Sequence, residues 1–506
     1  MDYQSKILSL DVLKTTLAEV ASDRKRVVLC HGVFDLLHLG HIRYFDQARK
    51  FGDLLVVTVT ADDFVDKGNH RPILPELLRA EALAALAIVD YVAINPAPSA
   101  ADAIRMLRPA FYCKGGEFRQ GELGAGLKAE IEAANHVGTE VEFTGDNLLS
   151  SSNLINKHLN VFSPATEAWL KDFRGRRSIE EVRAYIEGSS SLKTLVVGES
   201  IIDEYVFCDP LGKSTKDPVL ASLYHSIEAY AGGSLAVANN LAGFCDQVDL
   251  LTLLGESDRR EEFVRDGLRP NVHPHFVTQQ GAPTIHKRRF VDNHTNARMF
   301  ELYTMNDTPL VRENEAVLVE KLESIVDQYD LVVVADYGHG MLTPATIERL
   351  CGSARFLAVN TQANAGNRGF NTVSRYPRAD YVCVTMHEIA LETRMRHADW
   401  RDLVREVIQR VDCPRFTITT GKDGSLHYTP EDGFSQAPAL ATHVTDRVGA
   451  GDALLAVTSL LVVQNAPWDI IGFVGGLAGA QMVSQLGVRK TVTRDSITRS
   501  AASLMK

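Results

Sequence analysis

The chain has 506 residues, enough for about two to four domains that each bury a core. Hydrophobic residues make up 45% of it and charged residues 23%, which excludes extended disorder and a fibrous repeat. The formal net charge of -11 argues against a protein whose main ligand is nucleic acid, because a phosphate backbone is bound by clustered Lys and Arg. Small anionic substrates remain compatible, since they need only local positive charge.

Short apolar stretches indicate a cytoplasmic protein without a membrane segment. Residues 1–10 mix charges with apolar side chains, unlike a secretory signal, and the apolar run 453–463 is shorter than the roughly 20 residues of a membrane span. The 7 cysteines are scattered and form no Cys-x-x-Cys pair, which favours isolated thiols over a disulfide framework or a zinc site.

The first third of the chain alternates strand-like and helical patterns. A β-prone run at 26–30 is followed by helical spacing at 42–50 and by a second strand at 54–60. The pattern continues with helices at 76–87 and 100–107 and strands at 91–94, 110–113 and 140–143. It predicts a doubly wound α/β domain with a mostly parallel sheet over residues 1–158.

Residues 159–191 turn polar and charged, which predicts a linker with some helix at 179–186. Strands and helices alternate again from residue 192 to 506 and predict a second doubly wound α/β domain. Its expected strands are 194–198, 248–254, 331–335, 356–359, 381–384 and 416–420.

A candidate phosphate site follows the first strand, in the segment from His31 to His41. His38 and His41 are three residues apart, so the start of a helix can direct both imidazoles to one side. Two such donors beside a helix N-terminus can hold nucleotide phosphates while charge builds up at the α-phosphorus. The alternatives are a zinc site, which lacks an obvious third ligand, or a pair of core or surface histidines.

These residues resemble the nucleotidyltransferase superfamily that includes glycerol-3-phosphate cytidylyltransferase and the adenylyltransferase half of the heptose enzyme of ADP-heptose synthesis. The resemblance extends over about 27–157 and includes the stretches 67–72, 114–117 and 150–153. It implies a Rossmann-like fold with catalytic roles for His38, His41 and Lys67. It further implies nucleotide contacts from Gly32, Phe34, Asp35, Lys114, Ser151 and Ser152.

Two details bear on which enzyme this half is similar to. The spacing from Lys67 to Pro72 is closer to the heptose enzyme, and 145–149 lacks the arginine that precedes the hydroxyl run of glycerol enzymes. Either ATP or CTP stays open as the nucleotide. Taken alone, Lys67 is also compatible with a surface lysine, and Ser151 and Ser152 with a helix cap.

A second phosphate motif of different design runs from Asp446 to Asp452. The backbone N-H groups of Gly449, Ala450 and Gly451 can surround an anion at the start of a helix. Asp452 could accept the proton of a hydroxyl that attacks the γ-phosphate of ATP. Tight packing of the glycines and a helix-capping role for Asp452 are the alternatives.

This half resembles the ribokinase-like, or PfkB, carbohydrate kinases from about residue 192 to the end. The resemblance rests on the stretches 198–203, 232–240, 336–338, 420–424 and 446–452 and on Glu388. It implies that Asp452 is the base and that Glu388 organises Mg²⁺ through water. It implies sugar contacts from Asp203, Gly232, Gly233 and Asn240 and nucleotide contacts from Gly421, Gly424, Gly449, Ala450 and Gly451.

A basic cluster and two departures qualify this resemblance. Lys287 and Arg289 suit a phosphate already on the sugar, although a solvated basic edge fits the same pattern. Thr385 stands where the family usually has Asn, and the segment 232–236 differs from the Gly-Gly-Ala-Ala-Asn of heptose kinases.

The leading hypothesis is a bifunctional enzyme that phosphorylates a sugar, such as a heptose phosphate, with ATP and transfers a nucleotidyl group onto a sugar 1-phosphate. Its domain order is the reverse of the heptose enzyme that it resembles. Its expected partners are sugar phosphates, nucleotides, Mg²⁺ and, by resemblance, a second copy of the chain. The alternatives are a cytidylyltransferase fused to a kinase of another sugar or polyol, and a scaffold with a decayed kinase half.

Overall fold

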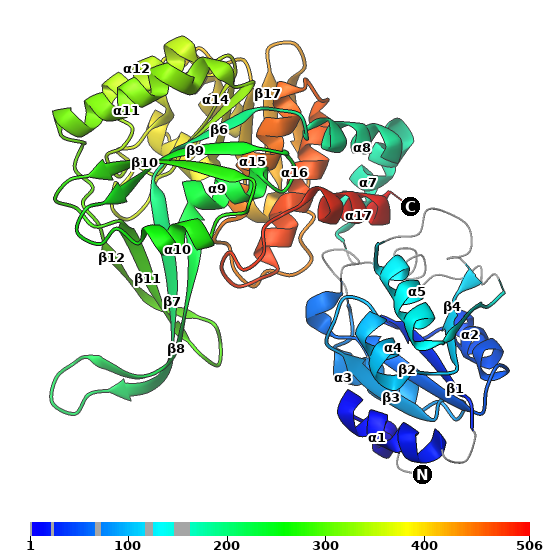
Figure 1. Cartoon of the computed structure of the whole chain (residues 1–506). Coiled ribbons are helices and arrows are strands. Elements are labelled where there is room, and N and C mark those ends of the chain that lie inside the picture. Colours follow the sequence, from blue (N-terminus) through cyan, green and yellow to red (C-terminus); the bar gives the residue numbers. More distant parts are fainter. Residues whose placement is uncertain (1–2, 22–24, 66–71, 117–124, 146–161, 506) are drawn as a thin grey trace. The chain divides into compact units, whose positions relative to one another are not determined.

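The computed structural model describes residues 3–21, 25–65, 72–116, 125–145 and 162–505, and it divides into two compact units, residues 1–161 and 162–505 (Figure 1). Among the described helices, none is both long and apolar enough to cross a membrane. Each unit has its own sheet and core and is described by itself.

The first unit contains a parallel five-stranded sheet in the order β3-β2-β1-β4-β5. Its strands are β1 Val27–Gly32, β2 Leu54–Thr60, β3 Tyr91–Asn95, β4 Phe111–Lys114 and β5 Glu140–Phe143. Its helices are α1 Leu10–Ala21, α2 Leu39–Arg49, α3 Glu76–Ala84, α4 Ala101–Leu107 and α5 Ala125–Val137. Separate apolar clusters fill the two faces of the sheet, so the predicted doubly wound fold is confirmed.

The strand order of this unit locates its ligand crevice. The chain moves outward from β1 to β3 and then returns to place β4 on the other side of β1. In open α/β sheets, ligands bind beyond the carboxyl ends of the strands at such a reversal. The end of β1, with His31 and Gly32, and the end of β4, with Lys114, therefore border the expected site.

The second unit is built on a nine-stranded sheet in the order β10-β9-β6-β13-β14-β15-β16-β17-β18. The strands from β10 to β16 are parallel, and β17 and β18 continue the sheet antiparallel. The strands are β6 Thr194–Gly198, β9 Val248–Gly255, β10 Val272–Gln279, β13 Leu331–Asp336, β14 Leu357–Thr361, β15 Tyr381–Thr385, β16 Phe416–Thr419, β17 Ser425–Thr429 and β18 Gly433–Ala437. The predicted mostly parallel sheet is confirmed.

Helices cover both faces of this sheet, and two large apolar clusters fill the space between the layers. These helices are α9 Ser234–Leu241, α10 Glu261–Asp266, α11 Arg312–Ile325, α12 Pro344–Ser353, α13 Met386–Thr393, α14 Trp400–Ile408, α15 Ala450–Val463, α16 Trp468–Val483 and α17 Arg494–Leu504. α15 packs against α16, and the first turn of α15 contains Asp452, the last residue of the second motif.

A four-stranded sheet, here called the lid sheet, projects from this unit (Figure 1). Its strands are β7 Ser200–Lys213, β8 Leu220–Gly233, β11 Ile285–Asp292 and β12 Arg298–Thr304, in the order β12-β11-β7-β8. Asp203 pairs with Lys287 and with Tyr230, while Arg289 pairs with Tyr205 and with Glu301. Because directly paired residues and alternate residues share a face of a sheet, these side chains all lie on one side, here called the catalytic face.

The segment predicted as a linker is not one over residues 162–191. It forms helices α7 Pro164–Arg176 and α8 Ile179–Gly188, whose apolar residues belong to the core of the second unit. Phe173 is fully buried and its ring lies 4.5 Å from that of Phe473 on α16. The polar composition favoured a linker because each helix has only one apolar stripe, which in α7 contains Leu170 and Phe173.

We expect Phe173→Ala to destabilise the second unit by about 3–5 kcal/mol, because it removes a fully buried ring and leaves a cavity. Urea unfolding followed by tryptophan fluorescence measures this change. Lys171→Ala, an exposed position on the same helix, is the matched control and should change stability by less than about 0.5 kcal/mol. Equal stability of the two variants would contradict the assignment of α7 to the core of the second unit and would favour a linker.

Candidate active sites

The loop after β1 has an unusual backbone that fixes the first site. Phe34 is buried with φ 50°, a left-handed conformation that is strained for a residue with a side chain. Its ring covers Gly32, where an added Cβ would lie 3.1 Å from the ring, and meets the His41 ring edge-on at 5.3 Å. Phe34 therefore packs under the histidine pair, and its contact with a nucleotide stays a prediction.

His38 and His41 come together as the sequence predicts. His38 is the N-cap of α2, and its Nδ1 accepts a hydrogen bond from the Gly40 N-H at 3.0 Å. Its ring stacks on that of His41 with 4.0 Å between centroids. Burial lowers the pKa of His38, so the ring is neutral near pH 7. With Nδ1 accepting, the proton of the neutral ring is on Nε2, where it can be donated to a ligand.

Asp35 connects the loop after β1 to the segment before α3. Its Oδ1 accepts from the N-H groups of Ile73 and Leu74 at 2.7 and 3.0 Å. Arg79, fully buried on α3, donates to the carbonyls of Val33 and Leu74 at 2.6 and 2.9 Å. These bonds hold the segment that follows residues 66–71 against the loop after β1. A direct contact between Asp35 and a nucleotide stays a prediction.

Lys114 lies at the end of β4, beside the end of β1. It is buried, and its Nζ is 3.0 Å from Glu130 Oε2 on α5. Burial raises the pKa of Glu130, but Lys114 and the Ala100 N-H outweigh this and leave the pKa below its usual value. Lys67, Ser151 and Ser152 lie outside the described residues. Over the described ranges, His, Cys, Asp and Glu side chains form no group of three or more suited to a metal ion.

The second site is built on the start of α15. Gly449 is the N-cap, with φ 78°, and an added Cβ would come within 3.1 Å of the Val488 side chain. An added Cβ on Gly451 would meet no atom within 4 Å, so the space above the first turn is open. The N-H groups of Gly449, Ala450 and Gly451 have no acceptor within the helix, because they begin it. This geometry is compatible with an anion, and the anion site stays a prediction.

Asp452 lies in the first turn of α15 and is held by a tyrosine from another element. The Tyr337 hydroxyl, just after β13, donates to Asp452 Oδ1 at 2.8 Å. Burial raises the pKa of Asp452 to about 6, and Asp203 adds to this while Tyr337 opposes it. A carboxylate whose pKa lies near neutral pH is suited to accept a proton from a hydroxyl.

The basic cluster faces the same site, and its Arg289 is already paired with acids. Arg289 forms ion pairs with Asp203 and, at 3.2 Å, with Glu301. Lys287 is buried, with its Nζ 5.2 Å from the centre of the Tyr303 ring and 5.9 Å from that of Tyr337. Burial lowers the pKa of Lys287, although Asp203 opposes the shift. The cluster therefore orders Asp203 on the catalytic face, and a phosphate contact stays a prediction.

The two glycines before α9 bring the backbone close to Asp203. An added Cβ on Gly232 would lie 2.2 Å from Asp203 Oδ2. Gly233 has φ 61°, and its added Cβ would meet the Glu199 carbonyl oxygen at 2.7 Å. Only glycine fits both positions, and the pair leads directly into α9. The predicted neighbourhood of Asp203, Gly232 and Gly233 is thus present in the structure.

We expect Gly232→Ala to raise the KM for the sugar at least about tenfold, because the new methyl group displaces the Asp203 carboxylate. The KM for ATP should change far less. Steady-state kinetics with each substrate varied in turn measures the two effects. Gly352→Ala is the matched control, because Gly352 is exposed, has no positive φ, as Gly232 has none, and an added Cβ there meets no atom within 4 Å. Equal effects on both KM values would contradict this role for Gly232.

Asn240 lies apart from the glycine pair. It is buried seven residues along α9 from Gly233, which is about 10 Å at 1.5 Å per residue. Its side-chain oxygen accepts from the Val492 N-H at 3.0 Å, so it ties α9 to the segment before α17. A sugar contact by Asn240 stays a prediction, and this bond gives it a structural role.

Glu388 is held by the residue that departs from the family pattern. Thr385 caps α13: its Oγ1 accepts from the Glu388 N-H at 3.2 Å, and Glu388 Oε2 accepts from the Thr385 N-H at 2.7 Å. Glu388 Oε1 accepts from the Ala363 N-H at 3.0 Å. Threonine in this place forms a reciprocal capping box. Thr385, although it departs from the family pattern, therefore holds the Glu388 side chain in place.

The glycines of the predicted nucleotide border lie at the turn between β16 and β17. Gly421 has φ 64° and Gly424 has φ 94°, and an added Cβ on Gly424 would meet the Ala437 carbonyl oxygen at 2.1 Å. The turn requires both glycines, and their contact with a nucleotide stays a prediction.

The contacts of three residues at the kinase site were not predicted. Tyr337 bonds Asp452, and Glu199 accepts from the N-H groups of Tyr337 and His339 at 3.0 and 3.1 Å. Burial and Asp336 raise the pKa of Glu199 to about 7. Asp446, which opens the second motif, accepts from the Tyr205 hydroxyl at 2.9 Å and from the Gly487 N-H at 3.1 Å. All three lie within the stretches 198–203, 336–338 and 446–452 that carry the family resemblance, and this was the available signal.

Fold and sites together define a two-unit α/β protein with a sugar-kinase fold in its second unit. The model of the pfkB family carbohydrate kinases matches residues 191–494, and the chain belongs to this family. A cytidylyltransferase-like model matches residues 29–122. Both predicted resemblances are confirmed.

Curated relatives match the chain in parts. "Bifunctional protein HldE" of Bradyrhizobium diazoefficiens is 26% identical over 303 residues, which are 59% of this chain and 60% of that protein. HldE of Geobacter sulfurreducens is 37% identical over 162 residues, 31% of this chain and 32% of that protein. Each alignment thus spans less than two thirds of the relative. Phosphofructokinase-2 from Escherichia coli, in complex with potassium, shares the fold with a TM-score of 0.51 at 16% identity, covering 62% of this chain and 100% of that one.

Proposed function

We propose that the chain is a bifunctional enzyme with an ATP-dependent sugar kinase in residues 162–505 and a sugar-1-phosphate nucleotidyltransferase in the first unit. The observation that carries the proposal is the presence of one helix-start phosphate site in each unit, one with His38 and His41 and one with Asp452. The two HldE relatives, named as bifunctional proteins, support this pairing. The motif resemblance favours a heptose phosphate as the sugar, and the availability of ATP favours the cytoplasm.

In the kinase half, Asp452 removes the proton of the attacking sugar hydroxyl. Its pKa of about 6 leaves it mainly ionised at pH 7 to 8, and Tyr337 keeps the carboxylate in place. The amides at the start of α15 stabilise the charge on the transferred phosphoryl group. The Asp203 carboxylate, oriented by Arg289, accepts hydrogen bonds from sugar hydroxyls.

Mg²⁺ is the metal that these residues fit. Each Glu388 oxygen accepts one amide hydrogen bond and keeps a lone pair for a metal-bound water. Mg²⁺ usually keeps several waters and is bound together with substrate phosphates. Held through water by Glu388, it would neutralise charge on the phosphates of ATP. The bonds that Thr385 makes to Glu388 favour a working kinase half over a decayed one.

In the nucleotidyltransferase half, the sugar 1-phosphate attacks the α-phosphorus of a nucleoside triphosphate and pyrophosphate leaves. The Nε2-H of His38 and the ring of His41 stabilise the charge that develops, and Lys67, Ser151 and Ser152 contact the triphosphate. No covalent bond to the protein is needed.

The full-length chain with Mg²⁺ tests both activities. Hexoses, heptoses and their terminal phosphates are incubated with ATP and ADP is measured. Sugar 1-phosphates are then incubated with ATP or with CTP and pyrophosphate is measured. We expect ADP from a heptose phosphate and pyrophosphate with ATP. Preference for CTP would favour the fused cytidylyltransferase, and absence of both products would remove the proposal.

We further propose that two copies pair through the lid sheet. Ile227, Phe300 and Leu302 on β8 and β12 are 46%, 55% and 50% exposed, and they lie on the face opposite Asp203. Exposed apolar rows on a projecting sheet favour burial against a partner. Light scattering after gel filtration should give a dimer that Phe300→Glu converts to a monomer.

A further inference from the structure

A pocket of about 620 Å³ lies at the edge of the catalytic face, where the end of β8 with Tyr230, α10 and the segment before α17 meet. Its volume is in the range of pockets that hold small metabolites. Its lining includes Arg269, Arg489 and Lys490 but only one acid, Asp266. Asp452, Asp203 and Lys287 are not part of the lining. The surplus of positive charge stands out in a chain with a net charge of -11.

Among the described residues, Arg269 has no acidic partner although it lines this pocket. Its Nη1 donates to Thr491 Oγ1 at 3.1 Å, and its buried Nε has no acceptor among the described residues. Buried N-H groups are nearly always hydrogen-bonded in folded proteins. A guanidinium group with donors to spare binds a phosphate through two parallel hydrogen bonds. Arg269 therefore points to an anionic ligand.

The loop that carries Arg269 is fixed by a buried amide. Asn239 on α9 accepts from the Arg269 N-H at 2.8 Å and donates to the Gly267 carbonyl at 2.7 Å. Gly267 also packs against Ala231 of β8, 3.1 Å from its added Cβ. The pocket wall is thus preformed, which lowers the cost of ordering it when a ligand binds.

The opposite wall connects the pocket to the lid sheet. Arg489 forms a two-pronged ion pair with Glu228 of β8, at 2.7 and 2.8 Å, and donates to the Tyr230 hydroxyl at 3.0 Å. Two residues earlier, the Gly487 N-H donates to Asp446, the residue that opens the anion motif of α15. A ligand held by this wall contacts the same short segment that joins the lid to the catalytic loop.

We infer that this pocket is a second ligand site that binds a small metabolite through its phosphate monoester. Arg269 and Lys490 bind the phosphate, and Tyr230 and Phe263 lie against the remainder of the ligand. Because the wall at 487–491 is bonded to both β8 and Asp446, occupancy restrains the lid sheet and modulates the kinase half. Binding does not require turnover by either half, so its test is independent of the proposed reactions.

Hydrogen exchange of the full-length chain tests the site. Inorganic phosphate and D-glucose 6-phosphate are the probes, each up to about 10 mM, which mostly fills a site of millimolar affinity. In the wild type we expect about tenfold slower exchange at 263–269 and 487–492 when the probe is present at about ten times its Kd. Stronger protection by the ester identifies a phosphorylated metabolite as the ligand, and equal protection identifies free phosphate.

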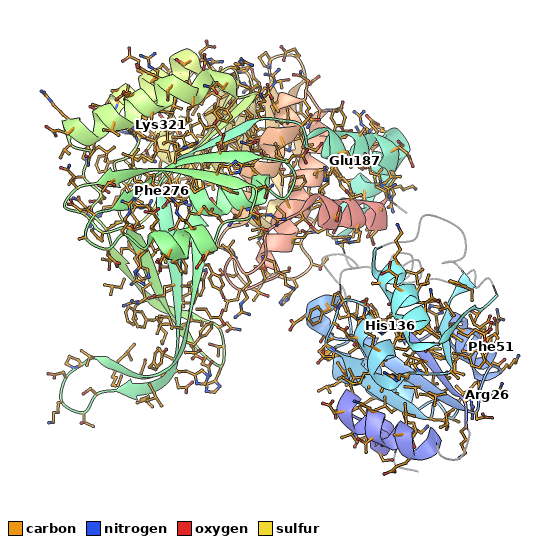
Figure 2. All side chains as sticks on the ribbon, viewed as in Figure 1. Arg26, Phe51, His136, Glu187, Phe276 and Lys321 are labelled. Carbon is orange, nitrogen blue, oxygen red and sulfur yellow. The ribbon has the colours of Figure 1, made fainter. Side chains whose placement is uncertain are left out.

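Variants locate the effect. Arg269→Gln should abolish the protection and Lys490→Gln should weaken it severalfold. Arg265→Gln is the matched control, because Arg265 is an arginine of α10 that does not line the pocket. Its guanidinium lies over the ring of Phe276 on β10, which is labelled in Figure 2. Absence of protection in the wild type, or protection that persists in a folded Arg269→Gln variant, overturns the inference.

Discussion

Asp452→Asn is expected to lower the kcat of the kinase reaction by about 10²–10⁴-fold, the range for loss of a general base. The amide keeps an oxygen for the Tyr337 hydroxyl, so the fold of the site is retained while proton acceptance is lost. The KM values should change little, because Asp452 acts on the proton in transfer. Initial rates of ADP formation measure the effect, with nucleotidyl transfer by the first unit as the internal control.

The same substitution should make the protein more stable above pH 6. Burial raises the pKa of Asp452 from 3.8 to about 6, so the folded state favours the protonated form. The cost of the ionised carboxylate therefore accumulates as pH rises from about 4 to about 6 and then stays constant. Removing it should stabilise the protein at pH 8 by roughly 1–3 kcal/mol. At pH 4 the two proteins should be nearly equal in stability.

Two measurements separate this role from a structural one. The wild-type kcat/KM, which reports the ionisations of the free enzyme, should rise with pH through about 6, as Asp452 loses its proton, and then level off. Asp495→Asn, which removes an exposed acid from the first turn of α17, should leave both the rate and its pH profile unchanged. A folded Asp452→Asn variant that keeps a tenth or more of the wild-type rate would remove Asp452 as the base.

Local features of both sites could be predicted because each motif lies at the end of a strand and the start of a helix. The spacing of His38 and His41 sets their stacking, and Gly449 with a positive φ sets the start of α15. Such geometry depends on a few consecutive residues. Buried strands such as β6 and β13 could also be predicted from the sequence, since their apolar runs are short and continuous.

Long-range pairing could not be predicted. Tyr337 reaches Asp452 across 115 positions, and Arg289 meets Asp203 across 86, because of how the strands are ordered. The sequence therefore showed a basic cluster but not the acids that neutralise it. β8 was missed because half of its residues are exposed and only its last two are buried, which leaves no alternation of buried and polar residues. Helix α7 was missed since its apolar stripe is narrow, whereas the helix predicted at 179–186 is confirmed as α8.

His38→Asn is expected to reduce nucleotidyl transfer by about 10²–10³-fold, the usual cost of one donor to a developing oxyanion. Asparagine is as good an N-cap as any residue, so its side chain replaces the bond to the Gly40 N-H, while the Nε2-H donor is lost. Pyrophosphate release measures the rate.

The controls for this variant separate catalysis from folding. Thermal unfolding of His38→Asn should match the wild type, whereas His38→Ala should cost about 1 kcal/mol more because it also removes the cap. His136→Asn, at an exposed position on α5 labelled in Figure 2, should leave nucleotidyl transfer unchanged. Kinase activity should persist in all three variants, because Asp452 belongs to the other unit. If His38→Asn were as active as His136→Asn, the capping bond alone would explain His38, and the charge on the α-phosphate would need another donor.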